Sequence, residues 1–192
     1  TPREIVLVGM NPGPWGMAQN GVPFGDMTFV REWLDISGPV DQPPRPHPKR
    51  PIQGFSSTRG EVSGQRVWGW ARERYGTPQR FFNRFFIANY CPLAFFAESG
   101  TNLTPDKLRK PDRNALFALC DQALSETAQA LRPTHIVGIG AFSASRVAAV
   151  AQREDADFTP GRIIHPSPAS PKANRGWAAA IEREFSDQGI EL

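Results

Sequence analysis

The chain has 192 residues, of which 40% are hydrophobic and 21% are charged, so it is globular rather than disordered, and one domain spanning residues 1–192 is expected. No apolar run approaches the roughly 20 residues of a membrane-spanning helix, and no signal-peptide pattern is seen. We therefore expect no membrane partner and a cytoplasmic protein in a bacterium, or a nuclear one in a eukaryote. The net charge of +3 by itself favours a nucleic-acid partner only slightly.

Cysteine usage limits the cofactors. Two thiols, Cys91 and Cys120, are too few for an iron–sulfur cluster, which usually takes four, and a disulfide is not expected in a reducing compartment. Cys120 falls in an apolar helical pattern and is expected in the core, whereas Cys91 is assigned to packing, with a place in a pocket wall as the alternative. We expect no metal and no organic cofactor.

The first predicted element is a buried strand over residues 4–9, which runs into a loop rich in glycine and proline. In an open α/β sheet, ligands bind at the carboxyl ends of the strands. The loop has no Lys, no Ser and no acidic residue before Asp26, so it is not a phosphate-binding P-loop. It offers the amide of Asn11, an exposed backbone, two aromatic residues and two methionines. This set suits a flat, neutral, hydrogen-bonding ligand such as a nucleobase.

Helices and further strands then alternate along the chain. Helices are predicted over residues 26–35, with Asp26 as N-cap, 63–75, with Ser63 as N-cap, 114–131, 141–153 and 171–185, with Pro171 in the first turn. Short apolar segments at 84–89, 135–140 and 161–165 are predicted to be strands. This alternation predicts a three-layer α/β/α fold around a central four-stranded, mostly parallel sheet.

Two loops carry clustered basic residues. Within the long loop 39–60, the residues Arg45, His47, Lys49 and Arg50 interrupt a proline-rich stretch, and they are either solvated or in contact with a ligand. After the last predicted strand, a second proline-rich loop leads to Lys172 and Arg175, at the start of the last predicted helix. A basic helix start of this kind favours phosphate.

Three segments together resemble a known family. Residues 9–14 (GMNPGP), 89–93 (NYCPL) and 165–168 (HPSP) look like the three motifs of the single-strand-selective monofunctional uracil-DNA glycosylases, one branch of the uracil-DNA glycosylase superfamily. The likeness extends through residues 54–55, 61–64 and 102–105, and so covers nearly the whole chain. It implies a monofunctional DNA glycosylase that flips uracil out of DNA and hydrolyses the N-glycosidic bond to begin base excision repair.

The resemblance also implies roles for residues in a base-binding site. Asn11 would position the attacking water, where related branches carry an Asp, and His165 would donate a hydrogen bond to uracil O2 as negative charge develops. Asn89 would pair with uracil O4 and N3–H, an arrangement that cytosine cannot match. Phe24 would stack its ring on the base. Backbone groups of Met10 and Gly13 would face the base and deoxyribose, and Gly13 would leave space beside C5 for groups such as hydroxymethyl.

The second proline-rich loop would form the DNA contact. By resemblance, a wedge and phosphate clamp would comprise Pro166, Ser167, Pro168, Ala169, Lys172 and Arg175. Ala169 stands where vertebrate members carry an arginine, which implies weaker penetration of a duplex. The expected partner is DNA, single- or double-stranded, and the expected state is monomeric. Two alternatives stay open: a glycosylase for deaminated purines such as xanthine or hypoxanthine, and a module that binds a damaged base without hydrolysis.

Overall fold

A four-stranded parallel sheet lies at the centre of the computed structural model, which describes residues 1–154 and 156–192. Its strand order is β2-β1-β5-β6, formed by β1 (Ile5–Gly9), β2 (Phe85–Asn89), β5 (His135–Ile139) and β6 (Thr159–Ile163). The predicted sheet is confirmed, and all its strands are parallel. The last strand was placed two residues too late, so His165 lies beyond its end rather than within it.

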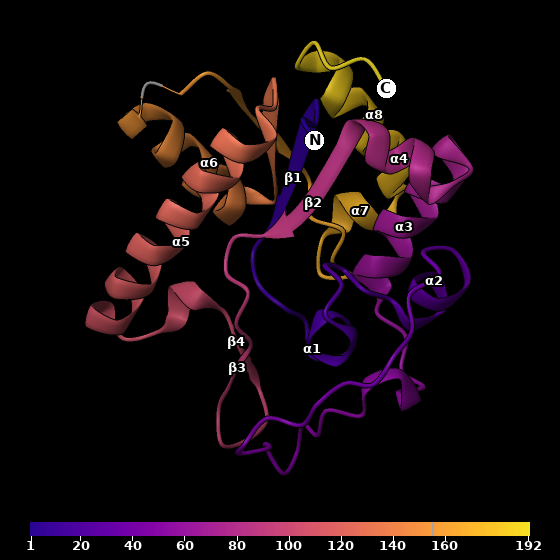
Figure 1. The fold of residues 1–192 in the computed structure, drawn as a ribbon, viewed down its shortest axis with the longest axis vertical. Helices are drawn as coiled ribbons and strands as arrows, with labels where there is room; N and C mark the ends of the chain where they lie inside the picture. Colours follow the sequence, from indigo (N-terminus) through magenta and orange to yellow (C-terminus); the bar gives the residue numbers. More distant parts are fainter. Residues whose placement is uncertain (155) are drawn as a thin grey trace.

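Helices cover both faces of the sheet, which confirms the three-layer prediction (Figure 1). On one face lie α3 (Val62–Tyr75), α4 (Pro78–Arg84) and α8 (Trp177–Asp187); on the other lie α5 (Lys110–Leu131) and α6 (Ala141–Glu154). Strand β1 is buried on both sides because its alternate residues enter different cores. Ile5 and Leu7 pack with α3 and α8, whereas Val6 and Val8 pack with α5 and α6.

Several helix boundaries differ from the prediction. Asp26 caps α2 (Met27–Glu32) as predicted, accepting from Phe29 N, but this helix is shorter than expected. Glu61, rather than Ser63, is the N-cap of α3. Helix α5 begins four residues earlier than predicted, with Pro111 in its first turn. The last predicted helix is divided into α7 (Pro171–Asn174) and α8, because Gly176 between them has a φ of 123°.

The loops at the carboxyl ends of the strands contain further elements, in the lower part of Figure 1. These are α1 (Met17–Asn20), the short helices η1 (Gly54–Ser56) and η2 (Pro105–Lys107), and a hairpin of β3 (Phe95–Phe96) and β4 (Asn102–Leu103). The long loop 39–60 is tied to this hairpin. His47 Nε2 lies 3.0 Å from Ala97 O, and Arg50 Nε donates to Gly100 O at 2.8 Å. No helix formed by the described residues is long and apolar enough to span a membrane.

Candidate active site

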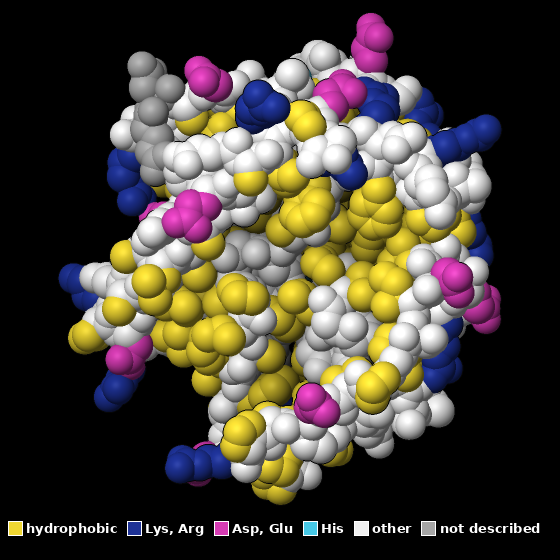
Figure 2. Space-filling model, viewed as in Figure 1, with side chains coloured by type: hydrophobic (Ala, Val, Ile, Leu, Met, Phe, Trp, Pro, Cys, Tyr) yellow, Lys and Arg dark blue, Asp and Glu magenta, His cyan; other side chains and the backbone are white. Residues whose placement is uncertain are grey.

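A cavity of about 400 Å³ opens beyond the carboxyl ends of the sheet, within the size range of small-molecule sites. Its lining includes every residue predicted for the base-binding site: Met10, Asn11, Gly13, Phe24, Asn89 and His165. Ser167, from the predicted DNA-contacting loop, lines it as well. Residues from three segments far apart in the sequence therefore meet in one place. On the face shown in Figure 2, hydrophobic side chains gather over the centre, and Lys and Arg lie mainly around the edge.

Glycine at position 9 lets Asn89 and Phe24 approach each other. Gly9 and Asn89 are direct partners in the parallel β1–β2 register. A Cβ added to Gly9 would lie 2.3 Å from Asn89 Oδ1 and 2.8 Å from the Phe24 ring, so any larger residue would displace both side chains. The other end of the Asn89 amide donates from Nδ2 to Met17 Sδ at 3.0 Å. Sulfur is a weak acceptor, so a bound base can take over this donor at little loss.

Phe24 has an unusual backbone conformation. Its φ is 54°, in the left-handed region that residues with a Cβ seldom adopt. Its carbonyl accepts from Asp26 N at 2.8 Å and lies against Gly64, where an added Cβ would be only 1.9 Å from the oxygen. The start of α3 thus fits tightly around this backbone. The strained conformation places the ring in the cavity, 6.3 Å from the imidazole of His165 between centroids.

His165 has a defined protonation state. Its Nδ1 accepts a hydrogen bond from the backbone N–H of Ser167 at 3.0 Å. The neutral ring must therefore carry its proton on Nε2, which leaves that nitrogen as a donor. Burial lowers the pKa of His165 below its ordinary value, because the charged imidazolium is poorly solvated there. The ring is thus a neutral donor, suited to an oxygen on which negative charge develops.

Asn11 and Gly13 share the loop that follows β1. Asn11 Nδ2 donates to Pro12 O at 3.4 Å, and no described residue donates to its side-chain oxygen, which is free to accept from a substrate or water. A Cβ added to Gly13 would meet nothing within 4 Å, and its φ does not lie in the left-handed region. Turn geometry therefore does not require glycine at position 13. The space beside it is open, as expected for room beside a bound base.

The sequence reasoning missed six residues that line the same cavity: Gly16, Met17, Glu61, Ser63, Asn102 and Thr104. Glu61 adds a carboxyl group to the lining of the site. Burial raises its pKa, but both its oxygens accept from the start of α3, at 3.2 Å from Ser63 N and 2.6 Å from Gly64 N. Glu61 therefore serves as a helix cap. An N-cap side chain accepts from a backbone N–H two or three residues later, so the sequence sign of this cap is an acidic residue three positions before Gly64.

Asn102 is a second residue that the sequence reasoning left without a role. Its side-chain oxygen is buried and has no hydrogen-bond partner among the described residues. Buried acceptors are normally paired. Asn102 lines the cavity from strand β4, so a buried acceptor without a partner lies in the wall of the base-binding site.

The predicted DNA-contacting residues divide into buried and exposed groups. Pro166 is buried and Ser167 lines the cavity, whereas Pro168, Ala169, Lys172 and Arg175 are exposed. Helix α7 has only four residues, so the argument that its N-terminus attracts phosphate loses most of its weight. The charges of Lys172 and Arg175 remain available, and their contact with DNA stays a prediction.

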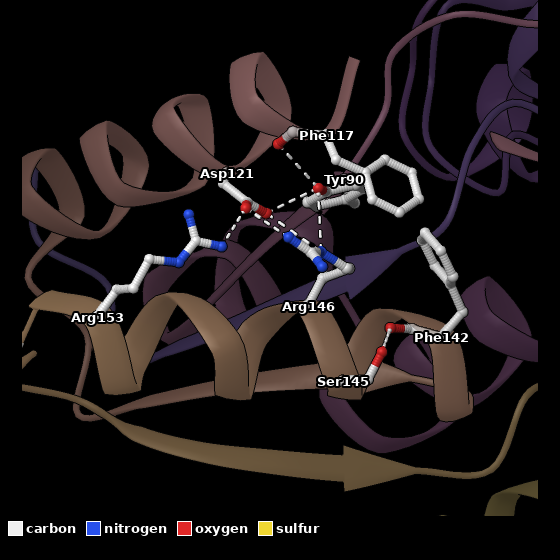
Figure 3. A network of polar contacts seen from close by, with 7 residues as sticks. All are labelled: Tyr90, Phe117, Asp121, Phe142, Ser145, Arg146 and Arg153. Carbon is white, nitrogen blue, oxygen red and sulfur yellow. Dashed lines mark hydrogen bonds and ion pairs between the residues drawn. The ribbon is translucent and has the colours of Figure 1, made fainter. Parts of the chain in front are cut away.

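Behind Asn89, a polar network holds the second motif in place (Figure 3). The Tyr90 hydroxyl donates to Asp121 Oδ1 at 2.7 Å, and Arg146 Nε donates to that hydroxyl at 3.1 Å. Arg146 and Arg153 both form ion pairs with Asp121. Burial alone raises the pKa of a carboxyl, but hydrogen bonds from Arg146 and Tyr90 keep the pKa of Asp121 below its ordinary value. Helices α5 and α6 are thereby joined to the end of β2.

The structure also shows where the two cysteines lie and how the potential metal-ligand side chains are distributed. Cys91 and Cys120 are both buried in the core between the sheet and helices α5 and α6, so the packing assignment fits the structure for both. Among residues 1–154 and 156–192, no group of three or more His, Cys, Asp and Glu side chains is arranged to hold a metal ion.

Comparisons with known proteins agree with this site. Residues 2–185 match the model of the uracil DNA glycosylase superfamily. The chain is 46% identical to the single-strand selective monofunctional uracil DNA glycosylase of Mus musculus, over 98% of this chain and 68% of that protein. For the Bos taurus protein of the same name, the identity is 43%, over 98% and 70%.

A solved structure supports the fold. The crystal structure of wild-type Pedobacter heparinus SMUG2 superposes with a TM-score of 0.71 at 17% identity, covering 98% of this chain and 76% of that one. This likeness supports the fold alone, whereas the sequence matches above identify the family. The chain belongs to the uracil DNA glycosylase superfamily, in the family of the single-strand selective monofunctional uracil DNA glycosylases.

Proposed function

We propose that this protein excises uracil from DNA by hydrolysing the N-glycosidic bond, which leaves an abasic site and begins base excision repair. Its relatives are named as monofunctional uracil DNA glycosylases. The observation that carries the proposal is the meeting of Asn11, Asn89 and His165, from the ends of three strands, in one cavity. The substrate is DNA with the damaged nucleotide flipped out of the stack, since a base within a helix cannot enter such a cavity.

In the proposed reaction, the bond between C1′ of the deoxyribose and N1 of uracil breaks, and its electron pair leaves with the base. The resulting charge is shared with O2, where Nε2–H of His165 donates a hydrogen bond. A water held by Asn11 forms the new C1′–O bond and then loses a proton to solvent. An amide cannot take that proton, so Asn11 acts by placing the water.

Base selection is assigned to Asn89, Phe24 and Gly13. The Asn89 amide presents a donor and an acceptor to O4 and N3–H of uracil, whereas cytosine would leave buried polar groups unpaired. Stacking on Phe24 adds roughly 1–3 kcal/mol for any flat base. Because the space beside Gly13 is open, 5-substituted uracils such as 5-hydroxymethyluracil are proposed as further substrates.

The experiment that tests the activity is base release from oligonucleotides that each carry one uracil, 5-hydroxymethyluracil, xanthine or hypoxanthine, as single strands and in duplexes. We expect release of uracil and 5-hydroxymethyluracil, and loss of both in the Asn11→Ala/His165→Ala double variant. Release of the purines alone would favour the deaminated-purine enzyme. Tight binding without release of any base would favour a damage-binding module.

We further propose that the protein acts as a monomer, because one chain supplies every residue of the base-binding site. Light scattering of the free protein and of its complex with a single-stranded oligonucleotide measures the mass directly. A dimer in the active complex would contradict this proposal.

A further inference from the structure

Arg66, on helix α3, reaches the loop that follows β6. Its NH1 group donates to Pro166 O at 2.8 Å and to Ser167 O at 3.3 Å, and its NH2 group donates to Asn174 Oδ1 at 2.8 Å. Arg66 is partly buried, and it takes part in no salt bridge found among the described residues. Its charge is therefore directed at the oxygen atoms of this loop.

One peptide group links Arg66 to His165. The carbonyl of Pro166 and the N–H of Ser167 belong to the same peptide unit, which is trans, so they point in opposite directions. Arg66 holds the oxygen of this unit, and its N–H donates to Nδ1 of His165 at 3.0 Å. A cation at the oxygen polarises the amide and strengthens its N–H as a donor.

We propose that Arg66 is a positioning residue for base release, acting through the Pro166–Ser167 peptide to fix the orientation of His165 and to keep its proton on Nε2. This inference rests on the proposed function, in which Nε2–H faces uracil O2. Without the guanidinium, the peptide is free to rotate, and Nδ1 loses its fixed donor. The imidazole then samples orientations and a tautomer in which no N–H faces the departing base.

Local contacts explain why the peptide needs an external anchor. Within the loop, Ser170 N donates to Ser167 O at 2.9 Å, and from the adjoining helix α7 Asn174 Nδ2 donates to Pro168 O at 2.8 Å. The carbonyl of Pro166 has no such partner in the loop among the hydrogen bonds of the described residues, and Arg66 supplies it. A residue from α3 thus completes a loop that lies about 100 residues further along the chain.

The test is a double-mutant cycle between Arg66 and His165, measured as the single-turnover rate of uracil release from a saturating single-stranded oligonucleotide. Arg66→Ala is expected to slow release by about 10- to 100-fold, the range for a misplaced catalytic group. Arg66→Lys should recover part of the rate, since one ammonium can still reach Pro166 O. In the His165→Ala background, Arg66→Ala should change the rate by no more than about twofold, because the group it positions is gone.

The matched control is Arg72→Ala, which removes an exposed arginine from the same helix. Arg72 lies over the Phe29 ring, 4.6 Å from its centroid, and no side-chain hydrogen bond joins it to the loop among the described residues. The Arg72→Ala variant should release uracil at the wild-type rate. An equal loss from Arg66→Ala in both His165 backgrounds would overturn the proposal and assign Arg66 to stability or DNA affinity. An unchanged rate for Arg66→Ala in the wild-type background would overturn it as well.

A second measurement separates this inference from the proposed activity. ¹⁵N NMR of the imidazole nitrogens, recorded on the protein without DNA, should show the Nε2–H tautomer of His165 in the wild type and in Arg72→Ala. A mixture of tautomers is expected in Arg66→Ala. Retention of the pure Nε2–H tautomer in Arg66→Ala would refute the positioning role, whether or not the protein excises uracil.

Discussion

The side-chain oxygen of Asn89 packs so closely against Gly9 that it leaves no room for a Cβ there. The two residues are partners in neighbouring parallel strands, and an added Cβ would lie 2.3 Å from the oxygen. The Asn89 amide thus crosses the position of Gly9 on the neighbouring strand and lines the cavity. This close approach is what requires glycine at position 9. Backbone conformation does not require it, because the φ of Gly9 lies outside the left-handed region.

We expect Gly9→Ala to slow uracil release by about 10- to 100-fold, because the methyl group pushes Asn89 and Phe24 away from the base. Single-turnover kinetics measure the loss, and thermal melting checks that the fold survives. Gly13→Ala is the matched control, since its methyl group meets nothing within 4 Å. It should keep most activity on uracil and lose more on 5-hydroxymethyluracil. Normal uracil release by Gly9→Ala would show that the approach of Asn89 is unimportant.

Asn11→Ala should act mainly on the chemical step. Removing a preorganised polar group is expected to raise the barrier by about 2–4 kcal/mol. Affinity for DNA should largely persist, because phosphate contacts dominate it. Single-turnover rates and a binding titration on the same oligonucleotide separate the two effects. Near-normal release would exclude Asn11 from placing the water.

His165→Ala should slow the release of uracil strongly and that of 5-fluorouracil less, because fluorine already stabilises the departing anion. The pH dependence provides a second readout. Burial lowers the pKa of His165 below 6.5, so the folded protein keeps the ring neutral where an ordinary histidine begins to protonate. Protonation would also replace the acceptor Nδ1 by an N–H facing Ser167 N.

The rate of uracil release should therefore fall in acid with a midpoint below pH 6.5. The stability of the fold should also decrease as the pH falls. As the pH falls through 6.5, the unfolded chain binds a proton that the folded chain does not, so the free energy of unfolding contributed by His165 decreases. His165→Ala should remove this part of the pH dependence. An equal loss of rate on uracil and 5-fluorouracil would count against the assigned role.

Sequence patterns predicted the sheet because its strands are short apolar runs. The base-binding residues came from the resemblance of three motifs to a known family, and these motifs lie where strands end: Asn89 is the last residue of β2, and Asn11 and His165 each stand two residues beyond a strand. Contacts made only in three dimensions were missed. Nothing near Arg66 in the sequence indicates that it holds a peptide of the distant loop.

Three further features were misplaced or missed in the sequence, each for its own physical reason. Ser63 is a common type of N-cap residue, but Glu61 reaches two backbone N–H groups and displaces it from this role. An apolar helical pattern runs from Pro171 to Phe185, yet the positive φ of Gly176 interrupts it. Asp121 appears on a helix as an ordinary polar residue, although Tyr90, Arg146 and Arg153 all converge on it.

Asp121→Ala is expected to lower the free energy of unfolding by about 3–5 kcal/mol, since it leaves the half-buried Arg146 and the Tyr90 hydroxyl without their acceptor. Denaturant unfolding gives the value. Asp112→Ala removes the partner of Arg109 in an exposed pair and should change stability by less than about 1 kcal/mol. Similar small losses in the two variants would mean that the network in Figure 3 contributes little to stability.

The segment from Pro168 to Arg175, in which Pro168, Ala169, Lys172 and Arg175 are exposed, is predicted to contact DNA beside the flipped nucleotide. A flipped base leaves a gap in the stack, and opening a paired duplex takes a few kcal/mol. Ala169 is small and exposed, so it fills such a gap poorly. We therefore expect Ala169→Arg to raise uracil release from a U:A duplex more than from a single strand. Paired rate measurements on the two substrates check this ratio.

Lys172→Ala tests the phosphate contact on the same segment. Because Lys172 is exposed and forms no salt bridge among the described residues, its charge can act on a phosphate. Its loss should weaken binding about equally for all sequences and reduce the salt dependence of affinity by about one unit of slope. Arg132→Ala removes an exposed charge just before β5, at the end of the sheet opposite the cavity, so it serves as the charge-matched control and should leave the slope unchanged. An unchanged slope for Lys172→Ala, with an unchanged duplex ratio for Ala169→Arg, would place the DNA-contacting surface elsewhere on the protein.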